Sequence, residues 1–295
     1  MQLSIHNWMR AETIETTLRR ISSLGYESIE IMGEPSLYDT KATRQLLKDY
    51  KISCWGSVTL MLEERNLLAR DQGQRERSVQ YVKDVVTMVK ELEGVMVSVV
   101  PGTVGKIVPD GRPDEEWTWA VDAMKEVYHH AQKEGIKIGI EPINRFETYF
   151  INRGDQAYAL AEAVGDDCGV CLDVFHMGIE EKDTYATMEL CKDRLYGFHL
   201  ADNNRMGCGM GNFDWAGIVN KLKDIGYDGA LAVEFSPPID RTPATPYPDM
   251  IDADPQGLSP EAKKFLEDHG SGAVTEEFYT MLTKVSADTI LPLIK

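Results

Sequence analysis

The sequence is short of positive charge. Its 295 residues include 31 Lys and Arg against 48 Asp and Glu, a formal net charge of −17. Nucleic acids and anionic membranes bind through clustered basic side chains, so we expect neither as a partner. No apolar run approaches the length that crosses a bilayer. The opening MQLSIHNWMR has neither the basic start nor the apolar core of a secretory signal, and we expect a cytoplasmic protein.

Cysteine is also scarce. Five cysteines, an odd number in a chain of this length, do not suggest a disulfide framework. Cys168 and Cys171 form a C-x-x-C pair, which can mark a redox or zinc site. This pair lies in an expected strand, where residues three apart point to opposite faces. Without a second pair to complete a zinc site, we predict two buried thiols that do not meet.

Two phosphate-binding signatures are missing. No G-x-G-x-x-G follows the first expected strand, so the dinucleotide-binding form of a doubly wound sheet is not favoured. No glycine-rich loop of the Walker type is present either. The sequence therefore indicates no phosphate site.

What the sequence does contain is an alternation of short apolar runs with amphipathic helical segments. Helical periodicity is found in segments such as 13–25, 78–92 and 116–135. This alternation predicts βαβ units and a parallel sheet, and eight units favour an α/β fold of the (β/α)8 TIM barrel type over an open sheet. We expect one domain, residues 1–295. The expected strands are 3–6, 28–32, 52–56, 94–100, 136–141, 168–173, 195–200 and 230–235.

Glycines mark the ends of several expected helices. Gly25, Gly135, Gly165 and Gly226 each come shortly before an expected strand. A glycine at that position is expected to adopt the left-handed conformation that ends a helix.

The region after the last strand breaks the alternation. Residues 236–257 are rich in proline and acidic residues and are not expected to form regular structure. Helices are expected at 259–270 and 276–294. We interpret 236–275 as an insertion, either a surface loop or a lid or subunit contact, because long loops in compact domains often carry function. The helix at 276–294 would close the fold.

Four consecutive strands end in residues that can bind metals. These are Glu141, Asp173, His199 and Glu234. In a barrel, the carboxyl ends of the strands build one mouth. Each acid alone could be a helix cap, but clustered buried carboxylates need a cation between them. Three carboxylates and an imidazole suit Mn²⁺, Mg²⁺ or Co²⁺ better than a thiolate-preferring metal.

Three further polar residues follow these strand ends. Glu147 comes six positions after Glu141, His176 three after Asp173, and Arg205 six after His199. They would lie in loops beside the ligands, where they could bind substrate oxygens. For Arg205 a salt bridge, and for His176 a loop-filling role, remain the alternatives.

The motifs EPINRFET, LDVFHM, GFHLADNNR and AVEF resemble those of the ketose 3-epimerases. These are the tagatose and allulose (psicose) 3-epimerases of the xylose-isomerase-like barrel superfamily. The segment NLLARDQGQRERSVQYVKD (66–84) also resembles the stretch before their fourth strand. The similarity extends from the N-terminus to about residue 236 and is strongest from Glu141 onward.

The resemblance implies a sugar epimerase. Glu141, Asp173, His199 and Glu234 would hold Mn²⁺ or Co²⁺, and Glu141 and Glu234 would also form the acid/base pair. Glu147, His176 and Arg205 would hold the O1 and O2 end of the substrate. The resemblance further implies a homodimer or homotetramer.

The expected chemistry is inversion at C3 of a free ketose. A proton beside a ketone is hard to remove because the enolate is high in energy, and a divalent ion lowers that energy. Inversion then needs one base on each face of the carbon, a role that Glu141 and Glu234 could share.

The sequence departs from the family pattern in two places near the expected mouth. These are the loop RMGCGMGNFDW (205–215) and the segment SPPIDRTPATPYPD after the last strand. Related activities therefore stay open: an aldose–ketose isomerase, an inosose dehydratase, or a C-glycoside deglycosidase subunit with an accessory chain. A non-catalytic metal- or sugar-binding protein is disfavoured because both candidate acid/base glutamates are present.

Overall fold

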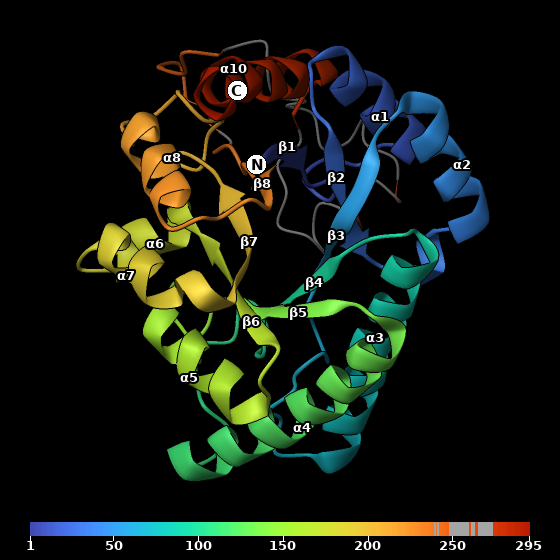
Figure 1. Cartoon of the computed structure of the whole chain (residues 1–295), viewed down its shortest axis with the longest axis vertical. Helices are drawn as coiled ribbons and strands as arrows, with labels where there is room; N and C mark the ends of the chain where they lie inside the picture. Colours follow the sequence, from blue (N-terminus) through green and yellow to red (C-terminus); the bar gives the residue numbers. More distant parts are fainter. Residues whose placement is uncertain (239, 241, 248–259, 261–262, 265–273) are drawn as a thin grey trace.

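Eight parallel strands occupy the centre of the computed structural model, with helices around them (Figure 1). The structure describes residues 1–238, 240, 242–247, 260, 263–264 and 274–295. The strands are β1 (Gln2–Ile5), β2 (Ser28–Gly33), β3 (Ser53–Thr59), β4 (Met96–Val99), β5 (Lys137–Ile140), β6 (Cys168–Asp173), β7 (Leu195–Leu200) and β8 (Ala230–Val233). The helices are α1 (Ile14–Ser23), α2 (Thr40–Tyr50), α3 (Gln72–Glu91), α4 (Pro113–Glu134), α5 (Gly154–Val164), α6 (Val174–Glu180), α7 (Thr184–Cys191), α8 (Trp215–Asp224) and α10 (Glu276–Ile294).

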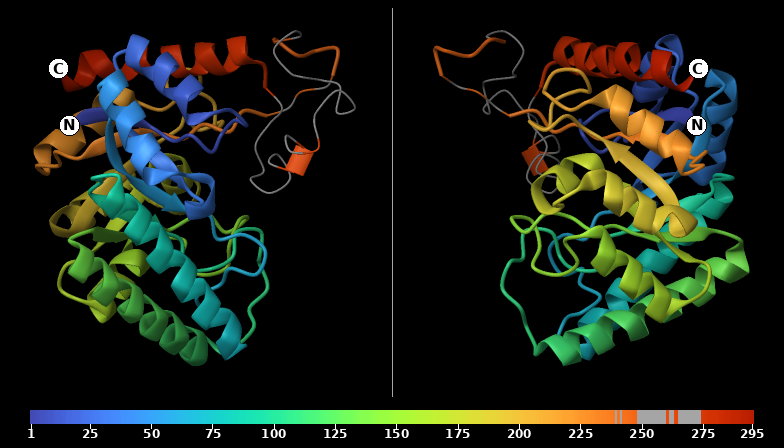
Figure 2. Two further views of the ribbon diagram at one scale, coloured as in Figure 1. Left: turned by 90° about the vertical axis from the view of Figure 1, so that its right-hand side faces the viewer. Right: turned by 60° about the vertical axis from the view of Figure 1, so that its left-hand side comes forward.

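The sheet nearly closes on itself. Its strand order is β1-β8-β7-β6-β5-β4-β3-β2, and every neighbouring pair is parallel. An isolated parallel bridge between His6 and Glu30 brings the end of β1 beside β2. The helices surround this ring, with α10 lying between α1 and α8 (Figures 1 and 2). The predicted (β/α)8 TIM barrel is confirmed.

Local capping explains where helices begin and end. Helix α3 begins at Gln72 rather than at the expected 78, because the Asp71 side chain accepts a hydrogen bond from the backbone N–H of Gln74 at 2.7 Å. Gly135 has φ 71 and ends α4 in the expected left-handed conformation. The same expectation is wrong for Gly165, which has φ 173 and is extended. Glycine fits there because a Cβ atom would lie 2.4 Å from the Tyr128 ring.

The strand limits place two of the predicted site residues just outside the sheet. Strands β5 and β8 end at Ile140 and Val233, so Glu141 and Glu234 each follow by one residue. Both remain tied to the neighbouring strand. The N–H of Glu141 donates to the Val99 carbonyl at 2.9 Å, and the N–H of Glu234 donates to the Leu200 carbonyl at 2.8 Å. Their side chains are therefore positioned by sheet hydrogen bonds.

The C-terminal helix α10 coincides with the predicted 276–294 and buries Phe278, Tyr279 and Leu282 against the barrel. The helix predicted at 259–270 falls almost entirely outside the described residues. The role suggested for 236–275 and the single-domain extent of 1–295 stay predictions. Within the described part of the chain, no helix is long and apolar enough to cross a membrane. All five cysteines are buried and free, in agreement with the prediction that Cys168 and Cys171 are two buried thiols.

Candidate active site

The four predicted strand-end residues meet at the mouth of the barrel. Glu141, Asp173, His199 and Glu234 are buried, and one ligand-type atom from each lies within 4.8 Å of the others. Nδ1 of His199 is 3.0 Å from Oε1 of Glu141 and 3.3 Å from Oε2 of Glu234. The sheet register pairs Asp173 directly with His199, which explains why these two side chains share a level. Sequence spacing alone could not establish this convergence.

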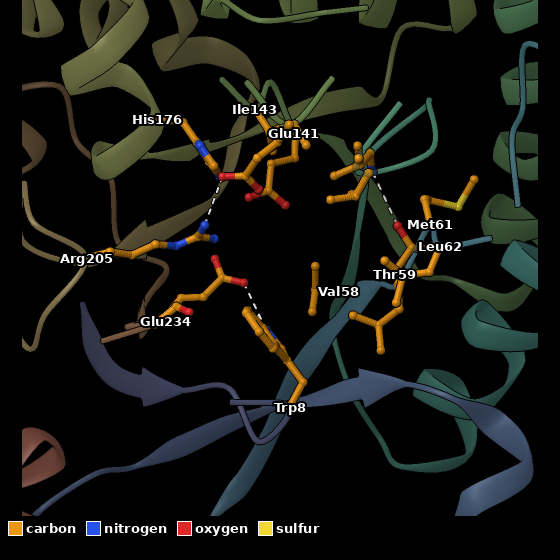
Figure 3. Close-up of a pocket in the computed structure, with 16 residues that line it drawn as sticks. Trp8, Val58, Thr59, Met61, Leu62, Glu141, Ile143, His176, Arg205 and Glu234 are labelled. Carbon is orange, nitrogen blue, oxygen red and sulfur yellow. Dashed lines mark hydrogen bonds and ion pairs between the residues drawn. The ribbon is translucent and has the colours of Figure 1, made fainter. Parts of the chain in front are cut away.

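A cavity of about 480 Å³ opens above this cluster (Figure 3). One side is polar and includes all three predicted substrate-binding residues together with two members of the cluster. The opposite side, where Val58, Met61 and Leu62 lie, is mostly apolar (Figure 3). The polar lining residues named here are Glu141, Glu147, His176, Arg205 and Glu234, and the apolar lining residues include Val58, Leu60, Met61, Leu62 and Val100.

Each carboxylate of the cluster is held by a hydrogen-bond donor. Ser98 Oγ donates to Oε2 of Glu141 at 2.7 Å, and Trp8 Nε1 donates to Oε1 of Glu234 at 2.9 Å. Oδ1 of Asp173 accepts from the backbone N–H of Phe175 at 2.7 Å and so caps α6. Among the described residues, Oδ2 of Asp173 has no hydrogen-bond partner. An unpaired buried carboxylate oxygen beside two more acids and an imidazole fits a divalent cation.

The charges in the cluster perturb one another strongly. Burial and the Glu234 carboxylate raise the pKa of Asp173 to about 8. Burial opposes ionisation of Glu234 as well, but His6 and His199 outweigh it and hold the pKa of Glu234 below its usual range. Burial would lower the pKa of His199, yet Cys171 and Glu141 raise it well above its ordinary value. A cation at the centre would relieve the repulsion between the carboxylates.

The three residues predicted to contact substrate are also held in place. Nδ1 of His176 accepts from the backbone N–H of Asn144 at 3.2 Å and lies 2.8 Å from its side-chain Nδ2, which directs Nε2 toward Oδ2 of Asp173 at 3.7 Å. Nη1 of Arg205 donates to Oε1 of Glu147 at 2.9 Å. Arg205 therefore makes the salt bridge considered as an alternative and also lines the cavity.

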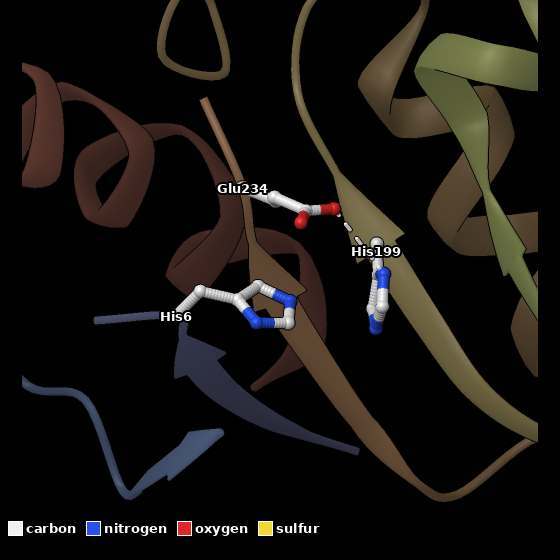
Figure 4. A group of neighbouring side chains, drawn as sticks. All are labelled: His6, His199 and Glu234. Atoms are coloured by element: carbon white, nitrogen blue, oxygen red, sulfur yellow. Dashed lines mark ion pairs between the residues drawn. The ribbon is translucent and has the colours of Figure 1, made fainter. Parts of the chain in front are cut away.

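Several residues of the site were missed by the sequence analysis. Trp8, Ser98 and Asn144 orient the predicted residues. Asn144 lies inside the EPINRFET motif, so its place in that motif was an available signal. His6, Glu30 and Cys171 lie around His199. Figure 4 shows His6, His199 and Glu234 converging from the ends of β1, β7 and β8.

The fold and the cluster define a (β/α)8 barrel with a carboxylate- and imidazole-lined cavity at its mouth. The chain belongs to the xylose isomerase-like TIM barrel family, whose model matches residues 18–268.

Known proteins similar to this chain include several sugar epimerases. The L-ribulose 3-epimerase of Mesorhizobium japonicum is 25% identical over 223 residues, which cover 75% of each chain. The 3-dehydro-D-guloside 4-epimerase of Escherichia coli is 24% identical over 238 residues, which cover 76% of this chain and 87% of that protein. A solved structure of D-psicose 3-epimerase with D-tagatose from Clostridium cellulolyticum H10 has a TM-score of 0.81 at 21% identity and covers both chains completely. The resemblance to ketose 3-epimerases seen in the motifs is confirmed.

Proposed function

We propose that this protein is a metal-dependent ketose 3-epimerase, an isomerase that inverts C3 of a free ketose. The main support is the placement of Glu141 and Glu234. Their carboxylates come from non-neighbouring strands, approach the same atom of His199 at 3.0 and 3.3 Å, and both line the cavity. A substrate carbon bound between them would have one carboxylate on each face, which is what inversion requires.

The proton chemistry follows from this placement. One glutamate removes the C3 proton to give an enediolate, and the other returns a proton to the opposite face. Ser98 and Trp8 fix the orientation of these two carboxylates through single hydrogen bonds, and the other oxygen of each carboxylate faces Nδ1 of His199. Positioned general acids and bases of this type contribute on the order of 10²–10⁴-fold in rate.

The donor set fits a divalent ion, with Mn²⁺ as the proposed metal and Co²⁺ or Mg²⁺ as alternatives. Glu141, Asp173, His199 and Glu234 would hold it, and the three carboxylates match the oxygen preference of these ions. The bound ion would supply Lewis-acid stabilisation of the charge that develops on the ketone oxygen.

The O1 and O2 end of the sugar is proposed to lie against Arg205, Glu147 and His176. Arg205 is half-buried, but its Nε atom is buried and, within the described residues, has no hydrogen-bond partner. A buried unsatisfied donor beside the cavity suits a substrate hydroxyl. His176 presents Nε2 because Nδ1 is occupied by Asn144.

The test is solvent-deuterium exchange. Mn²⁺-loaded protein is incubated in D₂O with free ketohexoses, ketopentoses, 3-keto glycosides, keto-cyclitols and C-glycosides, and NMR follows deuteration and product formation. We expect deuterium at C3 together with the C3 epimer. Glu141→Gln and Glu234→Gln should each abolish epimer formation, whereas Glu27→Gln, just before β2 at the opposite end of the barrel, should not.

Other outcomes would redirect the assignment. Exchange at C1 with an aldose appearing would indicate an aldose–ketose isomerase. Loss of water from a cyclitol would indicate an inosose dehydratase. Exchange only at C4 of 3-keto glycosides would favour an activity like that named for the Escherichia coli relative. Turnover only with an added subunit would indicate a C-glycoside deglycosidase, and no turnover with any of these would support a non-catalytic sugar-binding protein.

Assembly and location are part of the same proposal. A homodimer or homotetramer and a cytoplasmic location are proposed from the resemblance and from the five free cysteines. Sedimentation of the purified protein would measure the oligomeric state.

A further inference from the structure

A buried carboxylate lies behind His199, on the side of the ring away from the candidate ion. Glu30 comes from β2 and is fully buried, and its Oε2 atom is 3.4 Å from Nε2 of His199. The other ring nitrogen, Nδ1, faces Glu141 and Glu234. The imidazole therefore has the candidate metal ligands on one side and a separate carboxylate on the other.

The Glu30 carboxylate makes no hydrogen bond within the described part of the chain that would stabilise the fold. Among the described residues, neither of its carboxylate oxygens has a hydrogen-bond partner. Nε2 of His6 is 4.0 Å away, and both ring nitrogens of His6 also lack partners in the part of the chain that the structure describes. Burying a carboxylate without donors destabilises a protein, so its presence needs another explanation.

We propose that Glu30 is a positioning residue for His199. When an ion binds Nδ1, Oε2 of Glu30, which is 3.4 Å from Nε2 in this structure, would accept the N–H of that nitrogen and hold the Nδ1 edge of the ring toward Glu141, Asp173 and Glu234. Carboxylate partners of metal-bound histidines fix the orientation of the ring and increase its basicity. The inference rests on the metal site of the proposed function and adds a residue that the sequence motifs did not include.

The neighbours of His199 support this role. The ring of His6 packs edge-on against His199, with centroids 4.5 Å apart and planes at 85°. Sγ of Cys171 lies 3.2 Å from Nε2. A thiol is a weak acceptor, so Glu30 is the stronger acceptor near this nitrogen. The bridge between His6 and Glu30 fixes both residues where β1 meets β2.

The experiment measures Mn²⁺ binding to the metal-free protein by calorimetry. Glu30→Met replaces the carboxylate with an apolar group of similar length, and we expect the Kd for Mn²⁺ to rise on the order of 10–100-fold. Glu30→Gln keeps an acceptor without the charge and should give a smaller rise. Ser28→Ala, a buried change on the same strand, should leave the Kd unchanged.

Thermal melting of the metal-free variants separates a positioning role from a packing role. The metal-free Glu30→Met protein should melt no lower than wild type, because a buried carboxylate whose oxygens have no hydrogen-bond partner among the described residues has been removed.

An unchanged Kd in Glu30→Met would overturn the inference. So would a weaker affinity accompanied by lower melting of both metal-free Glu30 variants, because this pattern indicates a packing role. A wild-type protein that binds no Mn²⁺ would refute the metal site, and the inference with it. The failure of the metal site is therefore distinguishable from failure of the Glu30 role alone.

Discussion

His199 and Glu141 are 58 positions apart in the sequence, yet Nδ1 of one lies 3.0 Å from Oε1 of the other. Their strands, β7 and β5, are not neighbours, because β6 lies between them. The contact therefore forms across the interior of the barrel. The cluster forms because the sheet curves and brings these strand ends together. Its buried charges shift one another's pKa values.

Divalent metal should stabilise the folded protein. Glu141, Asp173 and Glu234 cannot all ionise together without repulsion, and an ion that binds only the folded state compensates their negative charge. Mn²⁺ at a hundredfold excess over its Kd should raise the free energy of unfolding by about 2.7 kcal/mol. Thermal melting with Mn²⁺ and then with a chelator measures this shift.

The control for this prediction is Asp173→Asn. It keeps the size of the side chain and should lose most of the response to Mn²⁺. An equal response in Asp173→Asn and wild type would contradict the assignment of Asp173 as a ligand.

Metal binding should release protons at neutral pH. The pKa of Asp173 is raised to about 8 in the metal-free fold, above its ordinary value, so this carboxyl is largely protonated at pH 7. The ion binds the carboxylate and the deprotonated Nδ1 of His199, whose pKa is also raised, so affinity should fall as pH decreases below about 8, by up to tenfold per unit for each proton released. Calorimetry at pH 7 in buffers of different ionisation enthalpy counts the released protons. Binding without proton release at pH 7 would contradict this.

The sequence predicted the barrel and its four strand-end residues because both depend on local patterns. Alternating apolar runs and helical periodicity define the βα units, and the position of a residue at a strand end is a property of the chain itself. Glu141 and Glu234 were found for this reason, although each lies one residue beyond its strand.

Contacts between distant strands could not be predicted in the same way. Glu30 lies inside an apolar run of β2, and nothing in its neighbours in sequence indicates that it faces His199. Trp8 likewise shows no pattern that links it to Glu234, 226 positions away. Closure of the sheet brings these pairs together, and closure is a tertiary property.

Glu12 should stabilise the folded protein at neutral pH, and this contribution should be lost in acid. Glu12 follows β1 and receives hydrogen bonds from Arg10, Thr17 and Arg20, and Arg20 in turn contacts α10 through Thr280. Burial raises the pKa of Glu12, but Arg20 outweighs it and lowers the pKa below 4.5. The stabilisation is therefore present above about pH 4.5 and is lost as pH falls through the lower pKa of the folded state.

Glu12→Gln should lower the free energy of unfolding by about 1.5–3 kcal/mol at pH 7, the range for hydrogen bonds to charged groups. Urea denaturation at pH 7 and at about pH 3.5 measures the free energy of unfolding of both proteins. The difference between Glu12→Gln and wild type should be smaller at the lower pH. The exposed Glu27→Gln is the matched control and should show little difference at either pH. A difference that stays constant with pH would contradict the role of the charge.

Arg205 should contribute to substrate binding through the geometry of its guanidinium. Its Nη1 is committed to Glu147, and its Cζ lies 4.8 Å from the centroid of the Phe175 ring, which leaves the rest of the planar group facing the cavity. Lysine keeps the positive charge but cannot reproduce the planar guanidinium with its several N–H donors. We expect Arg205→Lys to lower kcat/KM on the order of 10–100-fold, mainly through KM, because hydrogen bonds to charged groups contribute about 1.5–3 kcal/mol. Arg145→Lys is the control: the Arg145 side chain is exposed and pairs with Glu180, so both constants should stay near wild type. A change in kcat alone for Arg205→Lys would place Arg205 outside ground-state binding.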